Sequence, residues 1–316
     1  MDQYPEFLQD LKPPTHQLVQ EMKQHGGVVL MEFVRLGEWR QLVEAVNSLD
    51  HGGPYEVVTW KPMPNDWPKI DNPHCRHVVH DAWLPQHIEN LQQAQAEHKH
   101  YRHGDSDEVT NHFYVPYGTV CHERERMMRA MEALNILDGS LYSRPATPIK
   151  DNILPLYAEQ PPIHAINHKT MEKHGASITQ SQRFDHGKNW RALRPYILSC
   201  QTAVVMDNYC FNDDYSGYLS EKMLFPIAAG VPWIYAGNRH QRQRLRERGF
   251  RPHMPMAETP EELIQQMLWL KAVFSNEQMT KNWQESQGEL IIHNQGVLAD
   301  LDKIIKWENK KKKCLF

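Results

Sequence analysis

The chain has 316 residues, of which 40% are hydrophobic and 23% charged, proportions typical of a soluble globular protein with one large domain or two ordinary ones. Its formal charge of −4 argues against a strong non-specific grip on nucleic acid, although partial protonation of its 19 histidines would add positive charge. The five scattered cysteines do not resemble a disulfide framework, no apolar run is long enough to span a bilayer, and the first residues lack a secretory signal pattern, so we expect a cytoplasmic protein.

Residues 1–105 are expected to form an N-terminal α/β domain. Residues 28–30 form a short continuous apolar run, as buried strands do, and residues 55–60 predict a second strand. Between them, apolar residues in 38–49 recur at helical spacing. The order strand, helix, strand indicates the start of an α/β fold.

A histidine-rich run at residues 73–80 needs a separate interpretation. It contains the possible metal ligands His74, Cys75, His77 and His80. Their spacing fits no standard zinc pattern, so a strand with histidines at a sheet edge is the prediction, with a metal site as the less favoured alternative. A polar helix at 87–97 and a charged, glycine-containing stretch at 98–110 follow, and we expect a domain boundary in that stretch.

Residues 106–285 predict a second α/β domain. Strands are expected at residues 113–116, 203–206 and 231–235, and helices at residues 121–134, 239–248, 260–274 and 290–307. The last helix, with the lysine-rich tail, forms a closing segment at 286–316. The polar loop after strand 203–206 lies at the strand's carboxyl end, where doubly wound sheets bind their ligands.

Ser220, Glu221 and Lys222 stand out within the stretch that follows this loop. Ser220 is suited to cap a helix, and Glu221 suits the positive end of the helix dipole. Lys222 is unfavourable there unless an anion lies beside it, so the three residues predict a phosphate site with Glu221 on the ribose hydroxyls. The alternative is that Glu221 and Lys222 are ordinary solvated charges.

The run YLSEKMLFPIAAGVPWI at residues 218–234 resembles the signature (I/L)-T-E-K-x-F-x-P-I-x-x-G-x-P-F-I. That signature occurs in phage and bacterial glycosyltransferases distantly related to the α1,3-fucosyltransferases. Gly237 and LRERGF at residues 245–250 resemble the pattern that follows it in that family. The resemblance implies a GT-B-like fold of two Rossmann-like domains with a cleft between them. The N-terminal domain, residues 1–105, would lie on the acceptor side, and the C-terminal domain would bind a UDP- or GDP-sugar.

A weaker resemblance lies upstream, where the family has a strand, the segment N-G-R-P-R-P-H-R and a helix. Its basic residue faces the donor phosphates. Here residues 116–119, PYGT, replace the Asn-Gly-Arg, so Arg124 is the residue expected to contact the diphosphate. His122 and Arg126 are alternatives, and Arg124 could instead be a surface arginine on an amphipathic helix.

Tyr215, Tyr218 and Asn208 are expected to line the sugar pocket of such an enzyme. Deprotonating the acceptor hydroxyl requires a base. Asp185 and His186 are the candidates in a polar, hydrogen-bonding stretch, and the alternative is an ordinary loop with a satisfied histidine.

The residues predict neither a metal nor a cofactor apart from the nucleotide-sugar substrate. No spaced Asp-x-Asp motif occurs, and Asp213 and Asp214 are adjacent, although such a pair can bind a metal through one carboxylate. Lysine and arginine can neutralise a diphosphate in place of a cation, so we expect turnover without metal.

Two acceptors and one non-enzymatic alternative remain. The arginine-rich helix at 239–248 and the lysines at 310–313 favour double-stranded DNA with a hydroxymethylated base, in the host cytoplasm if a phage encodes the chain. The net charge favours a surface glycan. The alternative is a nucleotide-binding or scaffold protein that kept the fold and lost the chemistry.

Overall fold

The structure is a computed structural model that describes residues 20, 27–30, 35–49, 54–59, 63–79, 88, 91, 109–116, 122–142, 194, 196–217, 219 and 221–313. For residues 27–30, 58, 122, 221 and 302–313 it describes the backbone alone. The chain divides into two compact units. Unit 1 comprises Met1–Trp83, Asn212–Tyr218 and Arg239–Arg244, and unit 2 comprises Leu84–Phe211, Leu219–Asn238 and Leu245–Phe316.

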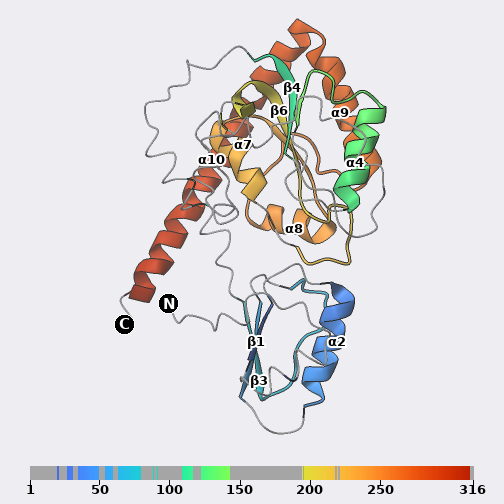
Figure 1. The fold of residues 1–316 in the computed structure, drawn as a ribbon. Coiled ribbons are helices and arrows are strands. Elements are labelled where there is room, and N and C mark those ends of the chain that lie inside the picture. The colour runs from blue at the N-terminus through green and yellow to red at the C-terminus, as the bar shows by residue number, and fades with distance from the viewer. Residues whose placement is uncertain are drawn as a thin grey trace, which may run out of the picture. The chain divides into compact units, whose positions relative to one another are not determined.

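Unit 1 is built on a parallel three-stranded sheet in the order β1 (Gly27–Leu30), β2 (Tyr55–Thr59), β3 (Cys75–Val79). The helix α2 (Leu36–Asn47) connects the first two strands (Figure 1), as the apolar spacing predicts. Its buried face is formed by Trp39, Leu42, Val43 and Val46, which cluster with Val57 of β2 and with Trp67. The indole N–H of Trp39 donates to the carbonyl of Pro68 at 2.7 Å, which fixes the chain between β2 and β3.

The predicted strand at the histidine-rich run is β3, the last strand in the order of this sheet. The ring Nε2 of His77 lies 2.9 Å from the hydroxyl of Thr59, and burial lowers the pKa of His77. Within the described ranges, no group of three or more His, Cys, Asp or Glu side chains is arranged to hold a metal ion.

Unit 2 is built on a parallel four-stranded sheet in the order β5-β4-β6-β7. The strands are β4 (Asn111–Val115), β5 (Leu141–Tyr142), β6 (Cys200–Met206) and β7 (Trp233–Ala236). Its helical elements are α4 (His122–Ala133), the 3-10 turn η4 (Glu221–Met223), α7 (Leu224–Ala229), α9 (Pro260–Phe274) and α10 (Glu277–Lys313). A further helix, α8 (Arg239–Glu247), follows β7 and contributes residues to both units.

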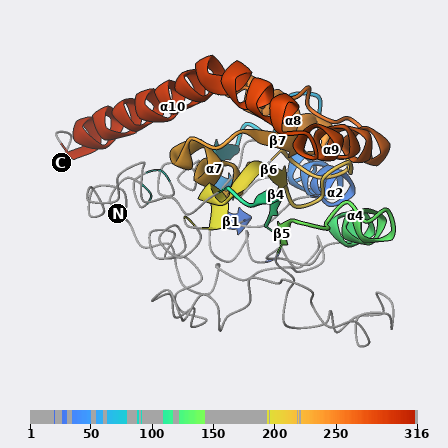
Figure 2. The same ribbon diagram turned by 90° about the horizontal axis from the view of Figure 1, so that it is seen from above.

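Successive residues of a strand point to opposite sides of its sheet, so the apolar strands of unit 2 present side chains on both faces. Helices cover both of these faces. One face packs Phe113, Val204 and Ile234 against α4 and α9. The other packs Tyr114, Ala203, Val205 and Trp233 against α7 and the middle of α10. Figures 1 and 2 both show α4 on one side of β4 and β6 and α7 on the other. Both units are therefore mixed helix and parallel sheet, and the predicted α/β class is confirmed.

The two units are not continuous in sequence. The predicted boundary at residue 105 lies outside the described residues, whereas the division by contacts first falls between Trp83 and Leu84. The predicted closing segment 286–316 belongs to unit 2, where Leu298 and Leu301 of α10 join the core beneath α7. Although α10 has 37 residues, none of the described helices is both long and apolar enough to cross a membrane.

Candidate functional site

The carboxyl end of β6 in unit 2 carries a buried polar network. Asp207 directly follows the strand, and its backbone N–H donates to the carbonyl of Ala236 at 3.0 Å. Its carboxylate Oδ2 accepts a hydrogen bond of 2.5 Å from the hydroxyl of Tyr235, and both residues are fully buried. Burial, and then the charge of Asp207, raises the pKa of Tyr235 well above its ordinary value, so the phenol stays protonated and donates.

Arg124 of α4 joins the same strand end. Its guanidinium Nη2 donates to the carbonyl of Met206 at 2.5 Å, and the residue has no solvent exposure. Its charge acts on Tyr235 by lowering the pKa that Asp207 raises. The surface-arginine alternative is therefore wrong, since a buried guanidinium ties α4 to the end of β6. The predicted contact of Arg124 with a diphosphate stays a prediction.

The loop after Asp207 has an unusual backbone. Tyr209 and Phe211 have φ angles of 56° and 65°, a left-handed region that bulky side chains seldom adopt. Between them the fully buried Cys210 donates its N–H to the carbonyl of Asp207 at 3.2 Å. Such strain is maintained only where the surroundings over-determine it, and it is concentrated at functional sites. The half-buried Asn208 lies at the start of this loop, two residues after the end of β6.

Lys222 lies in η4, a single 3-10 turn that contacts β6. We expected Ser220 to cap an α-helix with Lys222 in its first turn. Instead the α-helix begins at Leu224, its N-cap position is Met223, and no side chain caps it. Pro226 gives the physical reason, because it has no N–H to donate to the carbonyl of Lys222 four residues earlier.

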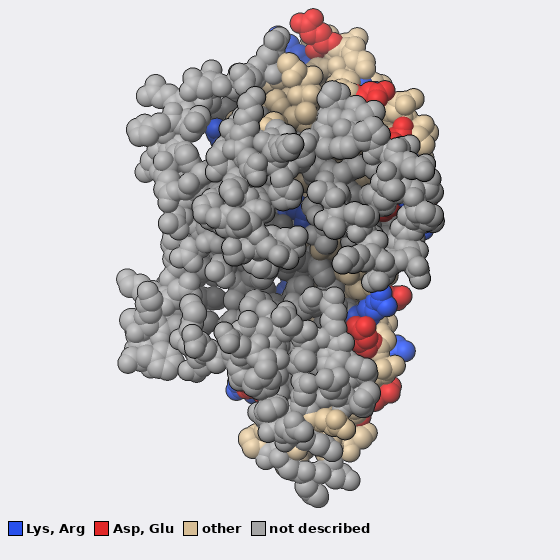
Figure 3. Space-filling view, viewed as in Figure 1, with Lys and Arg blue, Asp and Glu red and all other residues tan. Residues whose placement is uncertain are grey.

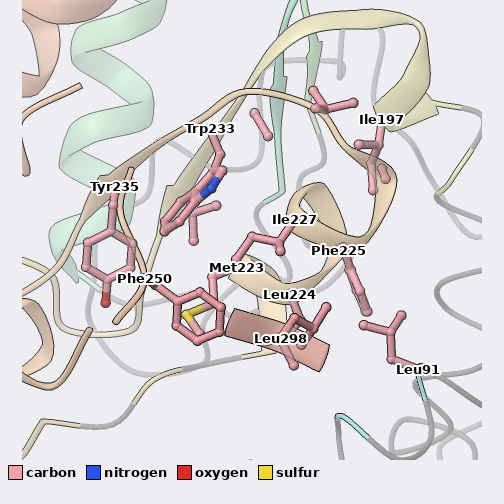
Figure 4. Close-up of a cluster of buried hydrophobic side chains, with 14 of the residues drawn as sticks. Leu91, Ile197, Met223, Leu224, Phe225, Ile227, Trp233, Tyr235, Phe250 and Leu298 are labelled. Atoms are coloured by element: carbon pink, nitrogen blue, oxygen red, sulfur yellow. The ribbon is translucent and has the colours of Figure 1, made fainter. Parts of the chain in front are cut away.

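The apolar residues after Lys222 anchor this turn in the core of unit 2. Figure 4 shows Met223 and Leu224 beside Phe250 and Leu298, with Phe225 facing Leu91. The helix ends at Gly230, whose φ of 71° is the left-handed conformation that favours glycine at this position. Lys222 is thus held by the packing of its neighbours, and it retains only 9% of its exposure.

Tyr215 lies in unit 1, with 5% exposure. Its hydroxyl accepts a hydrogen bond of 2.5 Å from Nε of Arg35, whose Cζ lies 5.1 Å from the centre of the phenol ring. The neighbouring carbonyl of Asp214 accepts from the N–H of Leu36 at 2.8 Å, so this loop is fastened to the start of α2. Its predicted place in a sugar pocket stays a prediction.

Asp213, half of the adjacent acidic pair, acts at the start of α8. Its Oδ1 accepts from the backbone N–H of Arg239 at 2.7 Å, and Oδ2 lies 3.9 Å from that residue's guanidinium. Arg239 also forms an ion pair of 2.7 Å with Asp66. Asp213 is therefore a helix cap in this structure.

Two of the predicted donor-binding residues lie at the carboxyl end of β6, namely Arg124, which bonds to Met206, and Asn208, which follows the strand. A third, Lys222, lies in η4, which contacts β6. Ser220, Tyr218, Asp185 and His186 lie outside the described residues, as does the side chain of Glu221. Sequence reasoning missed Asp207 and Tyr235 as members of the network. Asp207 could have been identified as a site residue from the sequence, because it is an acidic residue directly after a buried apolar strand. Polar groups of ligand sites in α/β sheets lie at this end of the strands.

No family model matches the chain, and a search of curated proteins found no match either. Its function is therefore inferred from its own residues and contacts.

Proposed function

We propose that the chain is a glycosyltransferase of the GT-B kind, made of two Rossmann-like domains with the donor and acceptor between them. It would move a sugar from a UDP- or GDP-sugar to an acceptor hydroxyl. The observation that carries the proposal is Lys222, a cation with 9% exposure in a turn that contacts the parallel strand β6.

Lysine is seldom buried to this extent, and phosphate is a ligand that a compact point charge binds well. Ligands of parallel α/β sheets bind at the carboxyl ends of strands, and η4 follows the loop that leaves the carboxyl end of β6. These points support a role for Lys222 in holding the donor diphosphate, with Glu221 on the ribose.

The proposed chemistry needs positive charge where the leaving group forms. As the bond between the anomeric carbon and the diphosphate oxygen breaks, its electron pair stays with the nucleoside diphosphate. Lys222, placed at that diphosphate, stabilises the added charge and lowers the barrier. The acceptor hydroxyl loses its proton to a base, for which the sequence offered Asp185 and His186. Asn208, at the strained loop, would contact the transferred sugar together with Tyr218 and Tyr215.

The acceptor is either a hydroxymethylated base in double-stranded DNA or a glycan. On the face shown in Figure 3, described acidic and basic side chains are interspersed rather than gathered into one basic patch. Salt distinguishes the two acceptors. DNA binding should weaken steeply between low and moderate salt because phosphate contacts release counterions, whereas glycan binding should change little.

A thermal-shift screen with UDP- and GDP-sugars, followed by a donor-hydrolysis assay, tests the proposal. A donor at one hundred times its Kd stabilises the folded state by about 2.7 kcal/mol, which raises the melting temperature measurably. We expect at least one donor to do so and to be slowly hydrolysed. Binding without hydrolysis or transfer would favour the inactive scaffold, and a flat response to every nucleotide-sugar would contradict the proposal.

A further inference from the structure

Among the described residues of unit 1, three buried side-chain polar atoms have no hydrogen-bond partner. They are Nε1 of Trp67, Oγ of Ser216 and Nε2 of His240, and no described residue is a hydrogen-bond partner of any of them. The residues are 4%, 0% and 7% exposed. Buried polar groups are normally hydrogen-bonded, so an unused group in a folded protein requires an explanation such as catalysis or a missing ligand.

The ring of His240 is held in one orientation. His240 is the second residue of α8, directly after the N–H that Asp213 caps. The ring makes a hydrogen bond to the backbone of Asp213 that raises its pKa, which identifies the carbonyl as the acceptor. Because Nε2 is the nitrogen without a partner, Nδ1 makes this bond and carries the proton. The lone pair is then on Nε2.

Trp67 lies against this ring, and Ser216 directly precedes Gly217, which touches the backbone of His240. The indole of Trp67 meets the imidazole edge to face, with ring centres 5.8 Å apart and planes at 85°. Gly217 touches the backbone of His240 so closely that a Cβ there would lie 2.7 Å from the carbonyl carbon and oxygen. That approach brings the adjacent Ser216 beside the start of α8.

The charges around the ring favour a neutral imidazole. Burial is the largest cause that lowers the pKa of His240, and the cation of Arg239 lowers it further. Asp66 and Asp213 oppose this, but the pKa stays below its ordinary value. A neutral imidazole with a free lone pair on Nε2 is a proton acceptor at pH 7.

The three groups complement a hydroxyl. An indole N–H only donates, an Nε2 lone pair only accepts, and a serine hydroxyl does either. A hydroxyl has one hydrogen to give and two lone pairs to offer. We propose that Trp67, Ser216 and His240 form the subsite for the acceptor hydroxyl, and that Nε2 of His240 takes its proton during transfer.

This inference rests on the proposed function. In the step, the hydroxyl oxygen forms a bond to the anomeric carbon and the bond to the diphosphate oxygen breaks. The electron pair leaves with the nucleoside diphosphate, and the hydroxyl proton moves to Nε2 and then to solvent. His240 would replace Asp185 and His186 as the base.

The test uses the full chain, with water as the acceptor and the nucleotide-sugar that gives the largest thermal shift as the donor. His240→Gln keeps a polar side chain of similar size but cannot act as a base. We expect it to lower donor hydrolysis at least about a hundredfold while leaving the donor's thermal shift unchanged. His74→Gln, the same change at an exposed site in unit 1, is the matched control.

Two further readouts keep the inference testable if His240→Gln folds poorly. Trp67→Phe keeps an aromatic side chain but loses the indole N–H, and it should reduce hydrolysis about tenfold. In the wild-type chain, nitrogen-15 NMR of the imidazoles should show the His240 proton on Nδ1, and hydrolysis should fall as acid protonates the ring.

The outcomes separate this inference from the function on which it rests. A wild-type chain that binds no nucleotide-sugar overturns the proposed function and this inference together. Wild-type hydrolysis that His240→Gln leaves intact, or a proton on Nε2, overturns the inference alone.

Discussion

At the scale of single residues, the Tyr235–Asp207 hydrogen bond determines how the end of β6 is organised. Both partners are fully buried, and Asp207 also bonds through its backbone to Ala236 of the neighbouring strand. A buried carboxylate needs donors, because its desolvation is otherwise uncompensated. Tyr235 supplies one at 2.5 Å, and the charge of Arg124 acts at the same place.

Tyr235→Phe removes the donor while keeping the ring. We expect it to lower the free energy of unfolding by about 1–3 kcal/mol, the range for losing one hydrogen bond to a charged group. Urea denaturation measures this. In a double-mutant cycle with Asp207→Asn, the loss from Tyr235→Phe should shrink, because the charged acceptor is gone. Equal losses in both backgrounds would show that the hydroxyl acts on something other than Asp207.

At the scale of elements, the start of α8 depends on Gly217. A Cβ at this position would come within 2.7 Å of the His240 backbone, so Gly217→Ala must displace the loop or the helix. We expect a destabilisation of about 1–3 kcal/mol, as in overpacked cores. Gly288→Ala in α10 is the control, because nothing lies within 4 Å of its added Cβ.

The control should stabilise the chain by up to about 1 kcal/mol, since alanine favours a helix interior over glycine. Thermal unfolding of the two variants side by side measures both effects. If Gly217→Ala and Gly288→Ala changed the stability in the same direction, the close approach of Gly217 to His240 would be contradicted.

Several elements could be predicted from the sequence because their signal is local. The apolar run at 203–206 falls within β6, and the helical spacing at 260–274 matches the bounds of α9, with Pro260 at its start. The start of α10 was not predicted. We expected a helix from residue 290, whereas the helix begins at Glu277. The prediction missed its first turns because polar residues and Gly288 weaken the apolar pattern there.

The candidate site was predictable only in part. The order of elements predicts Asn208 at the carboxyl end of β6 and Lys222 after the loop that follows this strand. The hydrogen bond of Arg124 to Met206 could not be predicted in this way, since the two residues are 82 positions apart and meet only in the folded sheet. The 3-10 turn at Lys222 could have been predicted from Pro226, whose missing N–H prevents the expected α-helical start.

At the scale of the whole molecule, the chain enters unit 1 three times. Asn212–Tyr218 and Arg239–Arg244 belong to it although they follow β6 and β7 of unit 2 in sequence. The hydrogen bond from Arg35 to Tyr215 joins residues 180 apart. Composition can indicate a linker, but it cannot show that later segments of the chain pack back into the first unit. The sequence therefore suggested domain boundaries only at residues 105 and 285.

The most direct test of the account is the affinity of a nucleotide-sugar for Lys222→Met, measured by calorimetry against wild type. Methionine keeps the buried stem and removes the charge, and Lys281→Met, at an exposed site of α10, controls for the loss of one cation. We predict that Lys222→Met binds the nucleotide-sugar at least about tenfold more weakly than wild type, the scale of one charge-assisted contact. The control should bind it with unchanged affinity. Unchanged affinity in Lys222→Met would contradict the role given to this lysine.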